Sequence, residues 1–570
     1  MGDRAAKKAS PGRGRTGIKI LLCAVFSFLC SVLLVVGRTV YRTNSVHSLF
    51  DTGPHRAAAC GAITVLWILC MAVSAAAYRG LGFLTGRCVR FARTSPAGPL
   101  YTADGRVKRW VFPVTWAAVF ASWIPAFMAY YPGITAYDTY VQSRQAMGGL
   151  AAITRYHPPL HTMFWGLCIK AGAALGVDAT LIYAPIQMAM LSFAFAVMLV
   201  FMLRRHCHPA LIVCGALYIV LDPVIAIFSV EMVKDSMLTV FLILLTVCLA
   251  ALTDKLNETG GQSTAGIRFW LILGVLTAIC CLLRNNIFYA VVLFLPFALI
   301  VCGRYRRQLA VTVGVALAVF LLINGPVYSA LGIGEGNARE MLSVPIQQIT
   351  TVAVQRGDDL SDKDREAIDA FLPYDELPDL YEPRFADYAK NAFDSEYFGE
   401  HKREFAQLWM DLFGRFPQEY WSAFLTLNIQ LWYPGSAAVD PSSLADPDSD
   451  RRYIETFIFP SEYCSGERAG RFPRLLAYYE DVANFSDWMG WPVIRVLFAL
   501  WAPIWILVIC FFLLMARGRP EKTLILYIPA FLWLTYMAGP TSALRYVFPI
   551  MALYPLIIAV TLQAQEVSAG

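Results

Sequence analysis

A series of long apolar runs constrains the fold of this chain more than any other feature. About twelve runs are long enough to cross the roughly 30 Å of hydrocarbon in a bilayer as helices. They lie near residues 18–36, 57–77, 110–130, 180–203, 209–229, 236–252, 267–283, 286–302, 308–330, 492–515, 522–538 and 545–563. Only 15% of the 570 residues are charged, against about 25% in soluble proteins. The chain is therefore predicted to be an all-α polytopic membrane protein in contact with the lipid bilayer.

The first apolar run, residues 18–36, follows a basic stretch and has two interpretations. A signal peptide also begins with a basic region, but its apolar part is only about 7–15 residues long. No small-x-small cleavage site follows this run. We expect a retained transmembrane helix, preceded by a cytoplasmic basic tail at residues 1–16.

Basic residues between the runs set the predicted orientation, because Lys and Arg gather on the cytoplasmic side of a membrane. The basic clusters all fall on the cytoplasmic side if two conditions hold. The N-terminus must be cytoplasmic, and the short stretch 160–176, which contains Lys170, must not cross the membrane. The basic residues concerned are Arg79, Arg87, Arg90, Arg93, Arg106, Lys108, Arg109, Arg204, Arg205, Lys255, Arg268, Arg304, Arg306, Arg307, Arg517, Arg519 and Lys522. Stretch 160–176 is then a helix in the membrane interface. Both termini are expected in the cytoplasm, and residues 131–179 form a first large outer loop.

The segment 332–490 differs from the rest of the chain in charge. It holds 29 Asp and Glu against 14 Lys and Arg, whereas the whole chain has a net charge of +6. We predict a soluble, mainly helical extracytoplasmic domain here. It separates a membrane domain at 17–331 from C-terminal transmembrane helices at 491–570. Membrane topology accounts for the basic surplus of the remainder, so no nucleic-acid partner is inferred.

Asp138 is the carboxylate that the first outer loop offers for chemistry. It stands among aromatic and turn residues in the stretch Tyr130–Tyr140. A carboxylate placed here can act as a general base towards an attacking hydroxyl group. The alternative is a side chain that caps a helix beginning near Thr139.

Two histidines four residues apart, His157 and His161, follow in the same loop. Pro158 disfavours helical backbone at the residue before it, which places His157 just outside the helix and argues against a shared metal. His157 is a candidate contact for a phosphate or a sugar. A hydrogen bond within the loop is the alternative.

The sequence Glu231-Met232-Val233-Lys234-Asp235 lies in a short connection between two apolar runs. Glu231 and Asp235 share one face if this segment is helical. They could ligate a divalent cation or supply a second acid, and Lys234 could bind a phosphate. An ion pair within the segment is the alternative.

Arg284 and Arg545 lie at the outer ends of apolar runs, and Tyr546 adjoins the second of them. A planar guanidinium group pairs well with phosphate oxygens, while snorkelling to lipid headgroups is the alternative. In the predicted topology these residues share the outer face with Asp138 and Lys234. Because charged groups near the membrane are costly, their convergence indicates a functional site.

Several of these pieces, in this order, resemble the GT-C superfamily of multipass glycosyltransferases, and most closely a branch of uncharacterised bacterial membrane proteins. The resembling segments are Tyr131-Pro132-Gly133 with Asp138, Gln142–Gln145, His157-Pro158-Pro159-Leu160, Val233-Lys234-Asp235, Arg284-Asn285-Asn286, Ser343–Gln348 and Arg545-Tyr546. The resemblance covers most of the chain. It implies a helical protein of a bacterial cell membrane whose first outer loop forms surface helices.

The resemblance also implies an activity. GT-C enzymes transfer a sugar from a polyprenyl-phosphate donor to a glycan, lipid or protein acceptor on the outer face, with a carboxylate of the first outer loop as base. That role falls on Asp138. Basic residues hold the lipid phosphate, and the candidates are Lys234, Arg284 and Arg545. We expect a single displacement with inversion at the sugar.

Metal use is one point where the chain departs from the resemblance. Many of these families place two acids side by side, whereas Thr139 follows Asp138 here. This difference puts a metal in the first outer loop in doubt. If Mg²⁺ or Mn²⁺ is used, Glu231 and Asp235 are the expected ligands.

Two other classes of protein fit part of the pattern. Twelve spans with both ends inside suit a transporter or flippase for a lipid-linked or envelope glycan, although the two halves lack the similarity of many transporters. A non-catalytic envelope assembly protein could use the acidic outer segment to bind a partner. Replacing Asp138 with Asn separates this last class from an enzyme.

Overall fold

The computed structural model describes residues 11–92, 98–135, 137–257, 265–436, 454, 456, 470–484 and 496–564. Over these residues the chain is about 80% helical and has no strand, only isolated β-bridges. Parts of the predicted tail and of the predicted acidic domain lie outside the described residues. The protein is an all-α membrane protein.

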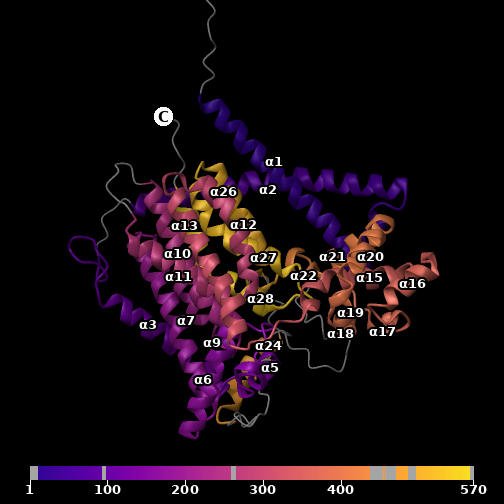
Figure 1. The fold of residues 1–570 in the computed structure, drawn as a ribbon. Helices are drawn as coiled ribbons and strands as arrows, with labels where there is room; N and C mark the ends of the chain where they lie inside the picture. The colour runs from indigo at the N-terminus through magenta and orange to yellow at the C-terminus, as the bar shows by residue number, and fades with distance from the viewer. Residues whose placement is uncertain are drawn as a thin grey trace, which may run out of the picture.

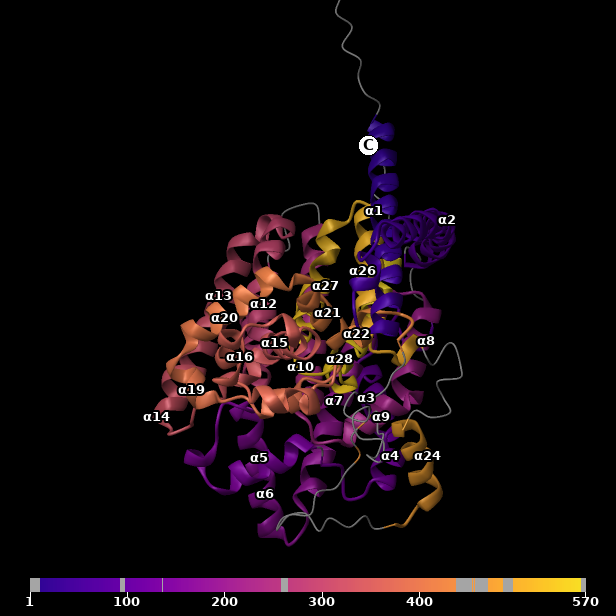
Figure 2. The ribbon, with the colours of Figure 1, turned by 90° about the vertical axis from the view of Figure 1, so that its right-hand side faces the viewer.

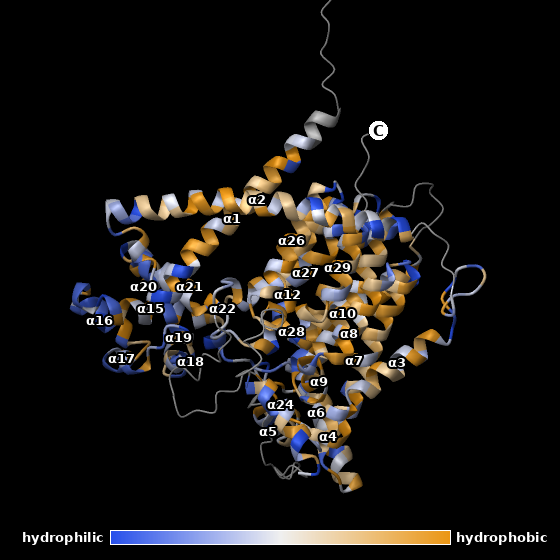
Figure 3. Cartoon of the chain, turned by 180° about the vertical axis from the view of Figure 1, so that it is seen from behind, coloured by the Kyte–Doolittle hydropathy of each residue, from blue (hydrophilic) through white to orange (hydrophobic). Residues whose placement is uncertain are grey.

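The apolar runs form a bundle of helices (Figure 1). Its helices are α3 (Val111–Ser122), α4 (Ile124–Ala129), α7 (Ala179–Arg204), α8 (Pro209–Leu221), α9 (Pro223–Val230), α10 (Lys234–Asn257), α11 (Ile267–Leu283), α12 (Asn285–Val301), α13 (Arg306–Leu322), α26 (Ala502–Ala516), α27 (Leu524–Tyr536), α28 (Leu544–Met551) and α29 (Tyr554–Gln563). Helices α7, α10 and α28–α29 lie at its centre. In the most apolar 18-residue stretch of each of these three segments, 67%, 78% and 78% of the residues are buried. Hydrophobic residues run along these helices in Figure 3.

The number of clear membrane spans is smaller than the sequence predicts. Within the described ranges, seven segments are long and apolar enough to cross a membrane, or eight if the bent pair α8–α9 counts as one span. The four remaining predicted spans form α11, α12, α26 and α27, which have 17, 17, 15 and 13 residues. Prolines lie inside α12 and α27, where they remove a helical hydrogen bond.

The bend between α8 and α9 has a local cause. Asp222 ends α8, and its carboxylate caps α9 by accepting the N–H groups of Val224 at 2.8 Å and Ile225 at 3.3 Å. Pro223 suits the first turn of the new helix. The two helix axes consequently meet at 54°, and the apolar run is broken at a capped, buried carboxylate.

Two long helices lie at the edge of the bundle. Helix α1 (Pro11–Thr43) and helix α2 (Gly53–Ala92) cross one another, and the Trp67 indole N–H donates to the carbonyl oxygen of Ala24 at 2.9 Å. Helix α2 runs across the bundle rather than along it, and it is seen nearly end-on in Figure 2. Much of the apolar surface of both helices remains exposed to the lipid that surrounds such a protein.

The described part of the acidic segment forms a helical unit with its own apolar core. Its helices are α15 (Ser343–Gln355), α16 (Asp362–Asp369), α17 (Leu377–Leu380), α18 (Asp387–Asn391), α19 (Ser395–Glu400), α20 (Lys402–Arg415) and α21 (Pro417–Leu427). The core gathers side chains such as Ile349, Phe371, Phe393 and Leu412, and it is separate from the core of the bundle. The short helix α22 (Ile429–Trp432) that follows packs into the core of the bundle.

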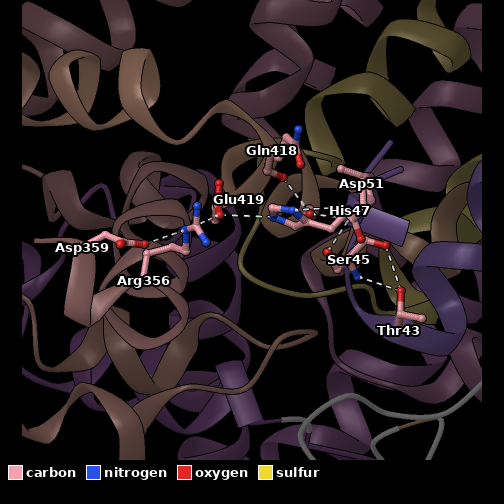
Figure 4. Close-up of polar contacts among 10 residues, drawn as sticks. Thr43, Ser45, His47, Asp51, Arg356, Asp359, Gln418 and Glu419 are labelled. Atoms are coloured by element: carbon pink, nitrogen blue, oxygen red, sulfur yellow. Dashed lines mark hydrogen bonds and ion pairs between the residues drawn. The ribbon is translucent and has the colours of Figure 1, made fainter. Parts of the chain in front are cut away.

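A buried carboxylate joins this unit to the start of the chain (Figure 4). Glu419 of α21 lies between Arg356, at 3.0 Å, and the imidazole of His47, at 3.2 Å. The hydroxyl group of Ser422 also accepts the backbone N–H of Val46 at 3.0 Å. The other side of the unit reaches the bundle, where the Ala386 N–H donates to the carbonyl oxygen of Pro540 at 2.9 Å. The unit is therefore fixed at two places.

The first outer loop forms two helices at one end of the bundle, α5 (Tyr137–Met147) and α6 (Pro159–Leu175). Helix α24 (Pro473–Asn484) lies at the same end, where it packs against α4 and α9. This is the end opposite to the one where α1 begins and α29 finishes (Figures 1 and 3). Helix α6 corresponds to the predicted helix at 160–176. Trp165 and Cys168 on it are buried, whereas Leu167 and Leu175 are exposed.

Candidate active site

The backbone brings the loop before α5 against the turn between α9 and α10. Ile134 and Glu231 form a parallel β-bridge, in which the N–H of Met232 donates to the carbonyl oxygen of Ile134 at 3.0 Å. The hydroxyl group of Thr139 donates to the carbonyl oxygen of Met232 at 2.9 Å. These bonds place the first turn of α5 beside the first turn of α10, so that Asp138 faces Lys234.

A cluster of two cations and one carboxylate results, which we name the Asp138 cluster: Asp138, Lys234, Arg545 and the adjoining His157. One oxygen of Asp138, Oδ2, lies 2.8 Å from Lys234 Nζ and 3.2 Å from a terminal guanidinium nitrogen of Arg545. The side chains of Asp138, Lys234 and Arg545 are 17%, 14% and 15% exposed. The cluster is thus mostly buried yet reachable from outside.

His157 completes the cluster as a neutral donor. Its Nδ1 lies 3.2 Å from Lys234 Nζ, and because an ammonium group can only donate, Nδ1 accepts and the ring proton is on Nε2. Burial, together with the nearby Lys234 charge, lowers the pKa of His157 to about 3. The Nε2 atom is buried without a hydrogen-bond partner. The cluster therefore carries a net charge of +1 and one unused buried N–H group.

The charges around Asp138 determine its protonation. Burial raises the pKa of this carboxyl group, but the positive charges of Arg545 and Lys234 outweigh burial and hold the pKa well below its usual range. Asp138 is consequently ionised at neutral pH. In this arrangement it is a weak proton acceptor, because accepting a proton breaks two ion pairs.

A chain of buried hydrogen bonds supports the cluster from behind. The Gln142 amide donates to His161 Nδ1 at 2.9 Å, and His161 Nε2 lies 2.8 Å from the Tyr183 hydroxyl group. Tyr183 donates to Gln187 at 3.0 Å, and Gln187 donates to the carbonyl oxygen of Glu231 at 2.7 Å. The chain ties α5, α6 and α7 to the turn before Lys234. His161 is thus fully engaged.

Two members of this chain, Tyr183 and Gln187, were missed by reasoning from the sequence. A signal existed, because both are polar groups within the apolar run 180–203, and buried polar groups require partners. The run alone does not say which partners they find.

Arg284 and Asp235 form a second, closed ion pair. Asp235 follows Lys234 directly in the sequence, but its carboxylate pairs with the guanidinium group of Arg284 and not with the Asp138 cluster. The side chains of Asp235 and Arg284 are 1% and 9% exposed. The guanidinium carbon of Arg284 lies 5.0 and 4.8 Å from the ring centroids of Tyr536 and Tyr546. The sequence suggested Arg284 for phosphate and Asp235 for metal, but the structure pairs these two with each other.

The ring of Tyr546 lies between the two ion-pair sites. It stacks on Tyr536 with centroids 5.6 Å apart, and the guanidinium carbon of Arg545 lies 5.3 Å from its centroid. Tyr546 therefore supports both arginines by cation–π contact while Arg545 reaches Asp138.

A metal held by Glu231 and Asp235 does not fit these residues. The carboxylate of Asp235 is already neutralised by Arg284. Among the residues that the structure describes, no group of three or more His, Cys, Asp or Glu side chains could hold a metal ion. No step is derived through a metal here.

Fold and site together define a helical membrane protein with a cationic, partly buried cluster at one end of its bundle. The chain belongs to a family of unknown function, DUF6020, whose model matches residues 149–569. This match includes His157, Lys234 and Arg545 of the cluster. No curated protein and no solved structure matches the chain.

Proposed function

We propose that the protein is a membrane glycosyltransferase of GT-C type. It moves a sugar from a polyprenyl-phosphate donor to a glycan, lipid or protein acceptor on the extracytoplasmic face. The observation that carries the proposal is the Asp138 cluster, in which a carboxylate and two cations meet at one end of a lipid-embedded bundle. Such a cluster provides both groups that transfer from a phosphate-linked sugar requires.

The cations act on the leaving group. When the bond between the anomeric carbon and the phosphate oxygen breaks, negative charge grows on that oxygen, and fixed positive charges in a partly dry site stabilise it strongly. Lys234 and Arg545 supply these charges, and the Nε2–H group of His157, on the side of the ring away from Lys234, offers a donor to another part of the ligand. Arg284 supports this arrangement through Tyr546 rather than by touching phosphate.

Asp138 acts on the acceptor. Its carboxylate takes the proton of the acceptor hydroxyl group as that oxygen bonds to the anomeric carbon from the side opposite the phosphate. The electron pair of the breaking bond leaves with the phosphate oxygen. The products are an inverted glycoside, a polyprenyl phosphate and a protonated Asp138, which returns its proton to solvent.

The same proposal includes a topology. The chain crosses a bacterial cell membrane about twelve times, with both termini in the cytoplasm and segment 332–490 outside. Support comes from the position of the cluster, at the bundle end opposite to the start of α1 and the finish of α29. The short helices α11, α12, α26 and α27 then cross in a thinned or tilted environment. The exposed Leu167 and Leu175 of α6 contact lipid.

The test is a transfer assay with the full-length protein in nanodiscs. Labelled polyprenyl-phosphate sugars and envelope extracts are supplied, and a new glycoside is sought, with its anomeric configuration read by NMR. We expect an inverted product that is lost in D138N while the protein stays monodisperse. Movement of an intact lipid-linked glycan across the bilayer without a new glycosidic bond would instead identify a flippase. Unchanged cellular function of D138N would identify an assembly protein.

A further inference from the structure

Both cations of the Asp138 cluster are bound to the same oxygen of one carboxylate. We propose that Asp138 holds the place of a phosphate group: a phosphate monoester or diester that enters the site takes Lys234 and Arg545 away from Asp138 and so frees the carboxylate. This exchange rests on the proposed function, since it assumes that the entering phosphate belongs to the ligand on which the protein acts.

The chemistry of the contacts supports an exchange. Lys234 and Arg545 lie 2.8 and 3.2 Å from Asp138 Oδ2, and both kinds of cation bind carboxylate and phosphate oxygens through the same charge-assisted hydrogen bonds. A carboxylate and a phosphodiester, which is the linkage of the proposed donor, each bear one negative charge, and a phosphate monoester bears up to two. A phosphodiester also has two unesterified oxygens, so each cation can pair with an oxygen of its own instead of sharing Asp138 Oδ2.

The second observation is the buried Nε2–H group of His157, which Asp138 does not satisfy. His157 is only 2% exposed, and its Nε2 atom has no hydrogen-bond partner. An unpaired buried donor is costly, by about 1–3 kcal/mol, so its presence indicates an absent acceptor. Because Nε2 lies across the ring from Nδ1, the atom that faces Lys234, the acceptor is expected to be another oxygen of the same ligand and not the phosphate group that pairs with Lys234 and Arg545.

The exchange links binding of the donor to activation of the base. While the cations remain on Asp138, they hold its pKa well below the usual range against the effect of burial. Once they pair with phosphate, burial is left to raise the pKa of Asp138 and make it a better proton acceptor. The carboxylate then becomes competent only when a leaving group is in place.

The test measures phosphate binding by full-length protein in phosphatidylcholine nanodiscs. Three arms supply inorganic phosphate, a polyprenyl monophosphate, or phosphatidylglycerol in the disc. The variants are D138N, K234M, R545M and, as matched control, D362N, whose carboxylate is 97% exposed on α16. If D138N is not monodisperse, D138S carries the same comparison.

We expect D138N to bind phosphate more tightly than the wild type by about fivefold or more, within the usual range of coupling between sites, and D362N to be unchanged. The arm with the largest gain identifies the source of the phosphate. Unchanged or weaker binding by D138N in all three arms would overturn the exchange. K234M and R545M should bind phosphate less tightly than the wild type, and undiminished binding by both would also overturn the exchange. Failure of the proposed function reads differently: D138N would still gain phosphate affinity, but the wild-type protein would form no glycoside in the transfer assay.

Discussion

Two ion pairs begin at neighbouring residues of α10 and differ in almost every respect. Lys234 turns towards Asp138 in a cluster with a surplus positive charge and 14–17% exposure of the charged side chains. Asp235 turns towards Arg284 in a pair that is neutral and nearly inaccessible. The comparison teaches that position near a membrane surface does not make a charged residue part of a site. The two pairs differ in charge balance, because the Asp138 cluster has a surplus positive charge and the Asp235–Arg284 pair has none.

The largest expected effect is a loss of sugar-transfer activity when Asp138 of the cluster is replaced. In D138N the carboxylate that accepts the acceptor proton is gone, so the rate of sugar transfer should fall by about 10²–10⁴-fold, the usual contribution of general base catalysis. The rate is measured with a labelled polyprenyl-phosphate sugar in nanodiscs, and size-exclusion chromatography controls for folding. Transfer at the wild-type rate would remove Asp138 from the mechanism.

The next largest effect is a loss of folding stability when the Asp235–Arg284 ion pair is broken. D235N leaves the Arg284 guanidinium buried without its counter-charge, and breaking a buried ion pair from one side costs about 3–5 kcal/mol. We expect a large drop in thermal unfolding temperature in detergent. The double variant D235L/R284M, which removes both charges, should recover most of it. A D235N protein as stable as the wild type would show that the pair is not closed.

A smaller effect concerns phosphate affinity. K234M and R545M each remove one charge-assisted hydrogen bond, which contributes about 1.5–3 kcal/mol, so each should weaken polyprenyl-phosphate binding by roughly ten- to a hundredfold. The conservative variants K234R and R545K should keep part of the affinity. R284M should keep its affinity for polyprenyl phosphate. If R284M protein that is as well folded as the wild type lost as much affinity as K234M and R545M, Arg284 would also contact the ligand.

Much of this comparison was open to prediction from the sequence, and its limits are physical. Apolar runs predict membrane helices because lipid demands them. The cost of charge near lipid pointed to Asp138, Lys234 and Arg545, and equally to Glu231, Asp235 and Arg284, which lie outside the cluster. Sequence spacing cannot say which way two adjacent side chains turn. The pairing of Asp235 with Arg284 depends on contacts between α10 and the α11–α12 junction, far apart along the chain.

The course of the spans was not open to prediction for a related reason. Hydropathy registers the apolar run at 209–229 but not the break inside it, where the Asp222 carboxylate caps a new helix. In the same way the polar Gln187 is hidden within an apolar run, and its role follows only from the carbonyl groups that α9 presents to it. Local composition predicts the elements, while tertiary hydrogen bonds decide where they end.

The smallest effect is a dependence of stability on pH. Burial lowers the pKa of both His157 and His161 to about 3, so below the ordinary value of about 6.5 the unfolded chain binds more protons than the folded one. Stability should therefore fall as the pH drops below 6.5, and the loss at pH 5.5 should be about 1.4 kcal/mol for each histidine. Unfolding temperatures at pH 7.5 and 5.5 measure it.

Variants sharpen this test. H157N should reduce the loss of stability on acidification, whereas replacement of the exposed His55 by Asn should not. A wild-type protein whose stability is constant or rises between pH 7.5 and 5.5 would contradict the burial of neutral histidines at the cluster.

The most direct test of the central claim, that Lys234 and Arg545 hold the donor phosphate beside Asp138, is an electron cryo-microscopy structure of D138N in nanodiscs with a bound polyprenyl monophosphate. We predict phosphate oxygens at hydrogen-bond distance, about 2.7–3.2 Å, from Lys234 Nζ and the Arg545 guanidinium group. The Arg284–Asp235 pair should be unchanged. Phosphate bound at the opposite end of the bundle, or on Arg284 with Lys234 and Arg545 left untouched, would contradict the account.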